Sequence, residues 1–376
     1  MLYFTRTKRP LVYWSLCALV IVLAVLTAFF IFRREPDPTF NIISIITNTG
    51  DTNNEVANQN LNSKPTETSL IAVGDIMLSR VVGSKLKKNG FDYSFRETAE
   101  YLKTGDIVFG NLETSITPGR QINTGELSFR ADPGVETAMK DAGFSLVSLA
   151  NNHTPNFGAP GLSDTFSYLN AAGIDFVGAG ENEEQAYAPV YIERLGLTFA
   201  FLAYNDDDVV PAGYKAGSDR PGTAFMDIAK LTESIQKARE RANFVIISMH
   251  SGTEYTTEPN KSQKEFAHAA IDAGAELVIG HHPHVIQKAE IYQGKYIFYS
   301  LGNFVFDQMW SQETREGLVA KFLFNAKGLF KIEFLPIIIY DYAQPKAADT
   351  ESAIKMLDIL NLENIINNRY IELKQP

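Results

Sequence analysis

The sequence predicts a layered α/β fold from Ser69 onward. Short apolar runs typical of strands alternate there with amphipathic segments typical of helices, so the hydrophobic period switches repeatedly between about two and about 3.6 residues. Several runs are apolar throughout, as in strands that are covered on both faces. Gly143, Gly173 and Gly274 each follow an expected helix in an Ala-Gly pair, which is a common signal for a helix C-terminus.

The expected elements follow one another closely, and 45% of the residues are apolar, which is enough for a substantial core. The expected strands comprise residues 70–73, 107–109, 146–149, 174–177, 190–193, 198–204, 243–249, 275–279, 318–324 and 330–339. The expected helices comprise residues 98–103, 134–142, 161–172, 227–242, 264–273 and 353–360. We therefore expect a main domain over residues 69–345, followed by a C-terminal helix and tail over residues 346–376.

A transmembrane anchor is expected over residues 11–32. This run contains no charged residue and, at about 1.5 Å per residue, is long enough to cross a hydrocarbon layer of roughly 30 Å as a helix. No small-residue cleavage site follows it, so the pattern favours an uncleaved anchor over a signal peptide. Basic residues are slightly more numerous before the run than after it, which predicts a single-pass protein of the cell membrane with residues 1–10 inside and the main domain extracytoplasmic.

Composition predicts a flexible linker over residues 33–68, because this stretch is rich in Asn, Thr, Pro and Ser. A short apolar patch within it, Ile42–Ile46, is expected to lie on the membrane surface or on the main domain. The only cysteine, Cys17, lies in the predicted anchor, so the folded body holds no disulfide. The net charge of −10, with no basic run beyond the flanks of the anchor, argues against nucleic acid as a partner.

Histidines gather at the ends of expected strands. Five of the six lie in three short segments, residues 151–153, 249–252 and 280–284. Two acidic segments with the same layout end in Asp75 and Glu113. Ligands collect at the carboxyl ends of strands in α/β folds. Taken singly, Asp75 could cap a turn and Glu113 could lie at a solvated edge, but together the segments predict a metal site. Mixed carboxylate, amide and imidazole ligands suit zinc, manganese or iron better than magnesium or calcium.

Five motifs, in this order along the chain, resemble the CapA family. They are Ala72–Leu78, Gly110–Glu113, Ser148–His153, Gly280–Val285 and Ser300–Gln308. This family comprises capsule and poly-γ-glutamate synthesis proteins of the PgsA type, which have a calcineurin-like metallophosphatase fold. The resemblance, which covers residues 69–339, implies a four-layer α/β/β/α sandwich.

The resemblance also implies a site for two divalent transition-metal ions that share a water or hydroxide. It implies metal ligation by Asp75, Glu113, Asn152, His250, His282 and His284, and a general acid, His153. A carboxylate that bridges two cations about 3.5–4 Å apart lets the pair activate water and clamp an oxyanion. Pro283 restricts the backbone between two of the histidines.

The chain departs from the expected patterns at three positions. Asn156 stands where the family usually has Asp, which weakens the expected hold on the His153 imidazole. Ser251 stands where the family usually has Trp after the equivalent of His250. Met77 stands where other metallophosphatases have a metal-binding histidine, so one metal is expected to be held less firmly.

Further residues are expected around the metals. Those expected to contact substrate are Asn111, Arg130, Glu254 and Tyr255, and those expected to support the ligands are His281, Asn303 and Asp307. Asn111 could equally supply the contact assigned to Glu113. For Arg130 the alternative is a structural ion pair, and for Glu254 and Tyr255 it is packing. His281 is expected to shield the site, and His268 to be an ordinary helix residue.

The preferred hypothesis is a membrane-anchored protein that acts in synthesis or export of an anionic capsule polymer such as poly-γ-glutamate, alongside membrane subunits of a polymer synthase. Family resemblance supplies the polymer, whereas the residues supply only the site. One alternative is an extracytoplasmic metal-dependent phosphoesterase or amidase of the metallophosphatase type. Another is a non-catalytic scaffold of a membrane synthase complex.

Overall fold

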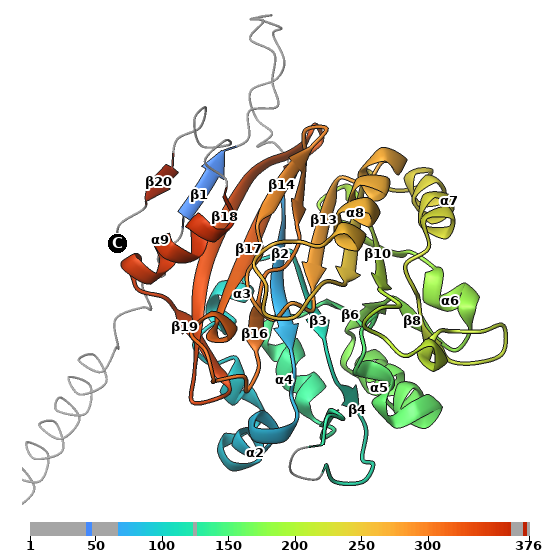
Figure 1. Ribbon diagram of the computed structural model, residues 1–376, viewed down its shortest axis with the longest axis vertical. Coiled ribbons are helices and arrows are strands. Elements are labelled where there is room, and N and C mark those ends of the chain that lie inside the picture. Colours follow the sequence, from blue (N-terminus) through green and yellow to red (C-terminus); the bar gives the residue numbers. More distant parts are fainter. Residues whose placement is uncertain (1–42, 47–66, 123–125, 362–370, 374–376) are drawn as a thin grey trace, which may run out of the picture. The chain divides into compact units, whose positions relative to one another are not determined.

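Two large β-sheets pack face to face in the computed structural model, which describes residues 43–46, 67–122, 126–361 and 371–373 (Figure 1). The ten-stranded sheet has the order β20 (Ile371–Leu373), β1 (Ile43–Ile46), β18 (Gly328–Tyr340), β17 (Glu316–Asn325), β2 (Thr68–Ile76), β3 (Ile107–Leu112), β6 (Leu146–Ser148) and β7 (Asp175–Val177), with β16 (Asn303–Val305) beside β2 and β19 (Gln344–Ala347) beside β18. The six-stranded sheet has the order β14 (Ala289–Tyr292), β15 (Lys295–Phe298), β13 (Leu277–His281), β12 (Phe244–His250), β10 (Leu197–Asn205) and β9 (Val190–Arg194). Two small two-stranded sheets pair β4 (Ser115–Ile116) with β5 (Arg130–Ala131) and β8 (Ala179–Gly180) with β11 (Gly222–Thr223).

Each large sheet contains a set of four adjacent parallel strands. In the larger sheet β2, β3, β6 and β7 pair in parallel, and in the smaller sheet β10, β12, β13 and β15 do so. Antiparallel strands flank these sets, among them β17 and β9. Within each parallel set the carboxyl ends therefore lie at one edge of the sheet, where polar side chains can collect.

Aromatic side chains fill the space between the two sheets. Side chains alternate along a strand, so every second residue of each sheet points inward. The ring of Phe109 from β3 stacks on that of Phe201 from β10, with centroids 5.8 Å apart. Phe199 of β10 meets Phe324 of β17 edge-on at 5.1 Å. Burial of each such ring contributes roughly 1.5–3 kcal/mol.

Helices cover the outer faces of both sheets. α7 (Ile228–Arg239) and α8 (Lys261–Ala273) pack on the six-stranded sheet through Leu231 and Phe266 (Figure 1). On the ten-stranded sheet, Phe166 of α5 (Gly158–Ala172) stacks on Phe176 of β7 at 4.7 Å. The other described helices are α2 (Arg80–Asn89), α3 (Ala99–Leu102), α4 (Val135–Ala142), α6 (Glu183–Tyr187) and α9 (Thr350–Ile359), with single 3₁₀ turns at Phe91–Ser94, Thr154–Phe157, Ala212–Tyr214 and Glu313–Arg315. The predicted layered α/β fold is confirmed.

Two stretches of the chain differ from the expected organisation or lie outside the described residues. Part of the predicted linker forms β1, in which Ile43 pairs antiparallel with Phe334 of β18, so the apolar patch joins the sheet of the main domain. The expected anchor over residues 11–32, and most of the linker, lie outside the described residues. Within the described ranges, no helix is both long and apolar enough to cross a membrane.

Candidate metal centre

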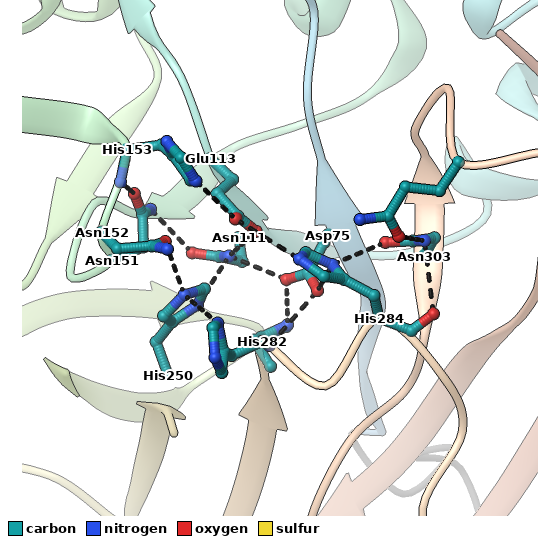
Figure 2. Close-up of polar contacts among 12 residues, drawn as sticks. Asp75, Asn111, Glu113, Asn151, Asn152, His153, His250, His282, His284 and Asn303 are labelled. Carbon is teal, nitrogen blue, oxygen red and sulfur yellow. Dashed lines mark hydrogen bonds and ion pairs between the residues drawn. The ribbon is translucent and has the colours of Figure 1, made fainter. Parts of the chain in front are cut away.

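The histidine and acidic segments meet where parallel strands of the two sheets end (Figure 2). Asp75 near the end of β2 is the neighbour of Asn111 in β3, and His250 at the end of β12 is the neighbour of His281 in β13. The loop after β13 carries His282 across the gap, where its backbone N–H donates to Asp75 Oδ2 at 3.2 Å. The predicted convergence of these segments is therefore present.

A close approach of two backbones positions the β2 end of the site. A Cβ atom at Gly74 would lie 1.9 Å from the carbonyl oxygen of Gly302, so only glycine fits between β2 and the start of β16. This contact lets the Asp75 N–H donate to the Gly302 carbonyl at 3.1 Å and sets Asn303 beside Asp75.

One group of donor atoms comes from Asp75, Glu113 and His284, which are all buried. His284 Nδ1 lies 3.2 Å from Asp75 Oδ2, and His284 Nε2 lies 3.8 Å from Glu113 Oε1. Within the described part of the chain, the buried Oε1 of Glu113 has no hydrogen-bond partner. A buried carboxylate oxygen without a donor is costly. A divalent cation between these atoms would satisfy it, so the donor set fits a metal ion.

A second group of donor atoms comes from Asn152, His250 and His282. His250 Nε2 lies 3.0 Å from Asn152 Oδ1 and 3.1 Å from His282 Nδ1 (Figure 2). Two ring nitrogens and an amide oxygen thus converge within a space the size of a coordination sphere. Nitrogen and oxygen ligands of this kind suit zinc, manganese and iron.

Burial sets the charges of the site. Burial and then the neighbouring His284 lower the pKa of His282 to about 3, and burial with His282 lowers the pKa of His250 well below its usual value. Both rings are therefore neutral near pH 7, as a metal ligand must be. Burial opposes ionisation of Asp75, but His281 and His284 outweigh it and hold the pKa of this carboxyl well below its usual value.

The pKa of Glu113 shifts in the opposite direction from that of Asp75. Burial, followed by the negative charges of Asp75 and Glu254, raises the pKa of Glu113 well above its usual value. Two buried carboxyl groups in contact disfavour each other's charge, and a nearby cation reverses that effect. The excess of negative charge is thus a second feature that fits bound metal.

The loop after β13, residues 282–284 and called the histidine loop below, has an unusual backbone. His282 has a φ of 97° and His284 a φ of 58°, on either side of Pro283. Such values are uncommon for residues with a side chain and persist at functional sites when surrounding contacts hold them. Here the contacts are the bond from His282 N to Asp75 and a bond from Asn303 Nδ2 to the His284 carbonyl at 3.3 Å.

Asn303 orients His284, as predicted for a supporting residue. Its Nδ2 donates to the carbonyl of Thr314 at 2.9 Å and to Gln308 Oε1 at 3.1 Å, which identifies Oδ1 as the acceptor. The Nδ1 of His284 lies 3.1 Å from that oxygen and donates to it. The lone pair of the imidazole is then on Nε2, the nitrogen that faces Glu113.

His153 is held at the edge of the site by Phe129 and Asn156. Its ring stacks on Phe129 with centroids 3.7 Å apart. Asn156 Oδ1 accepts from the Phe129 N–H at 2.7 Å and lies 2.9 Å from His153 Nδ1, so Nδ1 donates and Nε2 faces Glu113 Oε1, 3.9 Å away. Asn156 therefore keeps the orienting bond that the usual Asp would make, without its charge. Burial, against that bond, lowers the pKa of His153 to about 4.

Three predicted residues lie elsewhere than expected. Asn111 is fully buried and donates to Asp75 Oδ1 at 2.8 Å, so it orients a ligand and does not face substrate. Arg130 is buried and donates to the Thr117 carbonyl at 2.7 Å and to Asp132 at 2.6 Å, which matches the structural ion pair rather than an anion site. Asp307 pairs with Arg80 and accepts from the Val81 N–H, and so does not brace the histidine loop.

The remaining predicted residues include three beside the candidate site. His281 is buried behind Asp75, with Nδ1 3.5 Å from Asp75 Oδ1. Glu254 and Tyr255 lie on the exposed side of the histidine loop, and the Tyr255 ring centroid is 6.3 Å from that of His284. His268 pairs with Glu290 at 3.0 Å, away from the site, as expected for an ordinary helix residue.

Sequence reasoning missed Arg80 and Trp310. The Arg80 guanidinium lies 4.6 Å from the centre of the Phe129 ring that supports His153, and its charge opposes the raised pKa of Glu113. Trp310 is 64% exposed and meets Tyr255 edge-on at 5.8 Å, at the open side of the site. Both residues follow strands that carry site residues, which is the signal that could have identified them.

The fold and these donor atoms define an α/β protein with a candidate two-metal centre. The chain belongs to the family described as bacterial capsule synthesis protein PGA_cap, whose sequence profile matches residues 69–308 and so spans every candidate ligand. The predicted membership of the CapA family is confirmed.

Known proteins are similar to most of the chain. It is 36% identical over 281 residues to the capsule biosynthesis protein CapA of Bacillus anthracis, covering 73% of this chain and 68% of that protein. It is 34% identical over 272 residues to the PGA biosynthesis protein CapA of Bacillus subtilis strain 168, covering 72% and 71%. Among solved structures, the calcineurin-like phosphoesterase YfkN from Bacillus subtilis is similar over 76% of this chain and 89% of that chain, with 15% identity and a TM-score of 0.43.

Proposed function

We propose that the protein is a metal-dependent hydrolase of the metallophosphatase type that acts on an anionic capsule polymer, such as poly-γ-glutamate, during its synthesis or export. The observation that carries this proposal is the presence of two groups of carboxylate, amide and imidazole donors, one of which contains a buried carboxylate oxygen that lacks a hydrogen-bond partner among the described residues. Sites of this composition hold transition metals.

The two donor groups assign the ligands. Asp75, Glu113 and His284 would hold one ion, and Asn152, His250 and His282 the other. When bound, such a pair supplies a Lewis acid and a water of lowered pKa. The protein's own contribution is orientation: Asn303 directs His284 Nε2 into the site, and Asn156 directs His153 Nε2 toward it. Because Nδ1 carries the proton of the neutral ring, Nε2 of His153 would accept a proton at the reacting group and could then return it.

The proposed substrate is supported by the names of the relatives, and the proposed location by the sequence. Two relatives carry the names capsule biosynthesis protein and PGA biosynthesis protein, and a third, from Mycobacterium tuberculosis, the name probable polyglutamine synthesis accessory protein. A polymer of carboxylates suits a site built on cations. The uncharged run over residues 11–32 supports a single-pass membrane protein whose main domain is extracytoplasmic and works with membrane synthase subunits.

A phosphoesterase or amidase with another substrate is a second candidate. The position of His153 favours it, because a histidine that is oriented on Nδ1 and presents Nε2 to a metal pair serves proton transfer whatever bond is cut. Turnover of phosphoesters but not of polyglutamate by the full-length protein would favour this candidate. The reverse selectivity would favour the polymer.

The deciding experiment is the metal content of the full-length protein by elemental mass spectrometry. We expect about two transition-metal ions per chain in the wild type and their loss in a double variant, His282→Ala with His284→Ala. His268→Ala is the matched control, because this histidine pairs with Glu290 outside the site and its loss should leave the metal content unchanged. A wild-type metal content no higher than background would overturn the proposal and would favour the alternative of a non-catalytic scaffold.

If metal is present, turnover is measured next. Metal-dependent cleavage of polyglutamate or phosphoesters that falls sharply in His153→Ala would support the hydrolase. Retained metal without turnover of either substrate would contradict it.

A further inference from the structure

The turn after β12, residues 251–255, lies alongside the histidine loop and is hydrogen-bonded to it. The Ser251 N–H donates to the His281 carbonyl at 3.1 Å, and the Tyr255 N–H donates to the Pro283 carbonyl at 2.9 Å. Tyr255 has a φ of 62°, an unfavourable value that these contacts maintain. The turn is thereby fixed against the loop, and Glu254 lies within it.

The start of α8 reinforces this position. Asn260 and Gln263 form a capping box at its first turn. The Gln263 Nε2 also donates to Gln287 Oε1 at 2.8 Å, and Gln287 Nε2 donates to the carbonyl of Thr256 at 3.0 Å. The segment that carries Glu254 is therefore tied to the histidine loop from both ends.

Glu254 reaches the metal ligands from the solvent side. One of its carboxylate oxygens lies within 4.8 Å of ring nitrogens of both His282 and His284, close enough for one ion to contact all three side chains. Glu254 is exposed, whereas both histidines are buried. Among the candidate carboxylate ligands, Asp75 and Glu113 are fully buried, so Glu254 alone faces solvent.

The number of available ligands leaves room for another donor. Asp75, Glu113 and His284 give one ion three protein side chains, whereas zinc takes four ligands and several transition metals take more. Met77, which lies near the end of β2, does not help, because its sulfur accepts from the Ser79 N–H at 3.1 Å. Glu254 lies beside His284 of this group and His282 of the other, so its carboxylate can add a ligand to the metal pair.

We propose that Glu254 is a solvent-facing ligand of the metal pair and that an anionic group of the substrate displaces it. This inference rests on the proposed function, since it requires the metals. The buried ligands are held inside the protein, Asp75 for example by hydrogen bonds from Asn111 and from the His282 N–H. Glu254 is at the surface, so its side chain can swing into water when a carboxylate or phosphate oxygen takes its coordination position.

Cobalt(II) titration of the full-length protein tests the coordination step, because the visible spectrum of bound Co²⁺ reports its ligands. Glu254→Gln keeps the shape but removes the charged donor. We expect it to raise the Kd of the weaker Co²⁺ site about tenfold or more and to change the spectrum. Glu258→Gln is the matched control: it removes an equal charge from the same segment, where Glu258 pairs with Lys288. The control should match the wild type.

Inorganic phosphate tests displacement. In the wild type, phosphate must compete with Glu254 for the metal, so the change it causes in the Co²⁺ spectrum should need a higher phosphate concentration than in Glu254→Gln. Equal phosphate affinity in the two proteins would overturn the displacement. Because Glu254 is exposed, metal-free Glu254→Gln should unfold at the wild-type temperature, and Glu254→Asp, which keeps the carboxylate, should retain part of the Co²⁺ affinity.

The outcomes separate this inference from the proposal on which it rests. If the wild type binds no Co²⁺, the two-metal function fails. If the wild type binds two Co²⁺ ions, but Glu254→Gln and Glu258→Gln both match its Kd and spectrum, only the role of Glu254 fails.

Discussion

Replacing Gly74 by alanine tests whether a close backbone contact builds the metal centre. A Cβ atom there would lie 1.9 Å from the Gly302 carbonyl oxygen and 2.8 Å from its carbonyl carbon. Ordinary contact begins at 3.4 Å, and the difference from 1.9 Å requires β2 and β16 to separate by about 1.5 Å. Because the obstacle is backbone rather than a flexible side chain, no rotamer change removes it.

The separation acts on both stability and metal affinity. It breaks the bond from Asp75 N to the Gly302 carbonyl and moves Asn303, which orients His284. Overpacking of this kind costs about 1–3 kcal/mol of unfolding free energy. Loss of an orienting contact behind a metal ligand lowers metal affinity about 10–100-fold.

Urea unfolding of the metal-free full-length protein and Co²⁺ titration measure the two effects. Gly213→Ala is the control, because no heavy atom lies within 4 Å of a Cβ at Gly213. It should match the wild type in both assays. If Gly74→Ala also matched the wild type in both assays, the reasoning that β16 positions the ligands would be refuted.

Three further predictions concern single residues. The pKa of His282 is lowered from 6.5 to about 3, so below pH 6.5 the unfolded chain binds a proton that the folded chain does not. Metal-free stability should therefore fall by about 1 kcal/mol between pH 6.5 and 5.5, and by about 1.4 kcal/mol for each further pH unit until the folded pKa is reached. Urea unfolding at pH 6.5 and 5.5 measures this fall, and an unchanged midpoint contradicts it. Asn156→Asp should raise the pKa of His153 above its value of about 4, because a carboxylate stabilises the imidazolium, and an NMR titration of the metal-free protein that shows no rise would count against the assigned bond. Arg130→Met should lower stability by about 1–3 kcal/mol and leave Co²⁺ affinity unchanged, whereas weaker binding of phosphate to the Co²⁺ form would restore the substrate role.

The position of the candidate metal centre could be predicted because it follows from strand direction. His250 and Glu113 come directly at or after buried parallel strands, and the carboxyl ends of such strands share an edge. That prediction did not require knowing which strands belong to which sheet. Which polar residue faces the candidate metal centre and which lies behind it depends on side-chain direction, and the sequence does not show that the Asn111 side chain is directed at Asp75.

For Arg80 and Arg130, too, the sequence could not show which side chain lies near the site. Arg130 and Arg80 both lie near strands that lead to the site, and nothing in their spacing distinguishes them. Arg130 is buried by Thr117 and Asp132, which are its partners in the folded chain, whereas Arg80 has a positive φ of 50° that turns the chain after β2. These contacts depend on the tertiary structure.

Pairing at the sheet edges was also not predictable from local patterns. β1 lies between β18 and β20, and both partners are far from it in the sequence, so no local pattern marks Ile43–Ile46 as a strand of this sheet. The hairpin of β14 and β15 could have been found, because Gln293 and Gly294 form a two-residue turn with φ values of 49° and 78°. A Gly after a polar residue between two apolar runs is the signal for such a turn.

The exposed indole of Trp310, at the open side of the candidate metal centre, can report on binding through its own fluorescence. The sequence holds two tryptophans, Trp14 and Trp310, so Trp14→Phe leaves a single emitter beside Tyr255. Indole fluorescence moves to shorter wavelength when water leaves the ring. Any polymer or small anion that covers Trp310 as it enters the site can thus be followed by emission colour alone, without a label and without turnover.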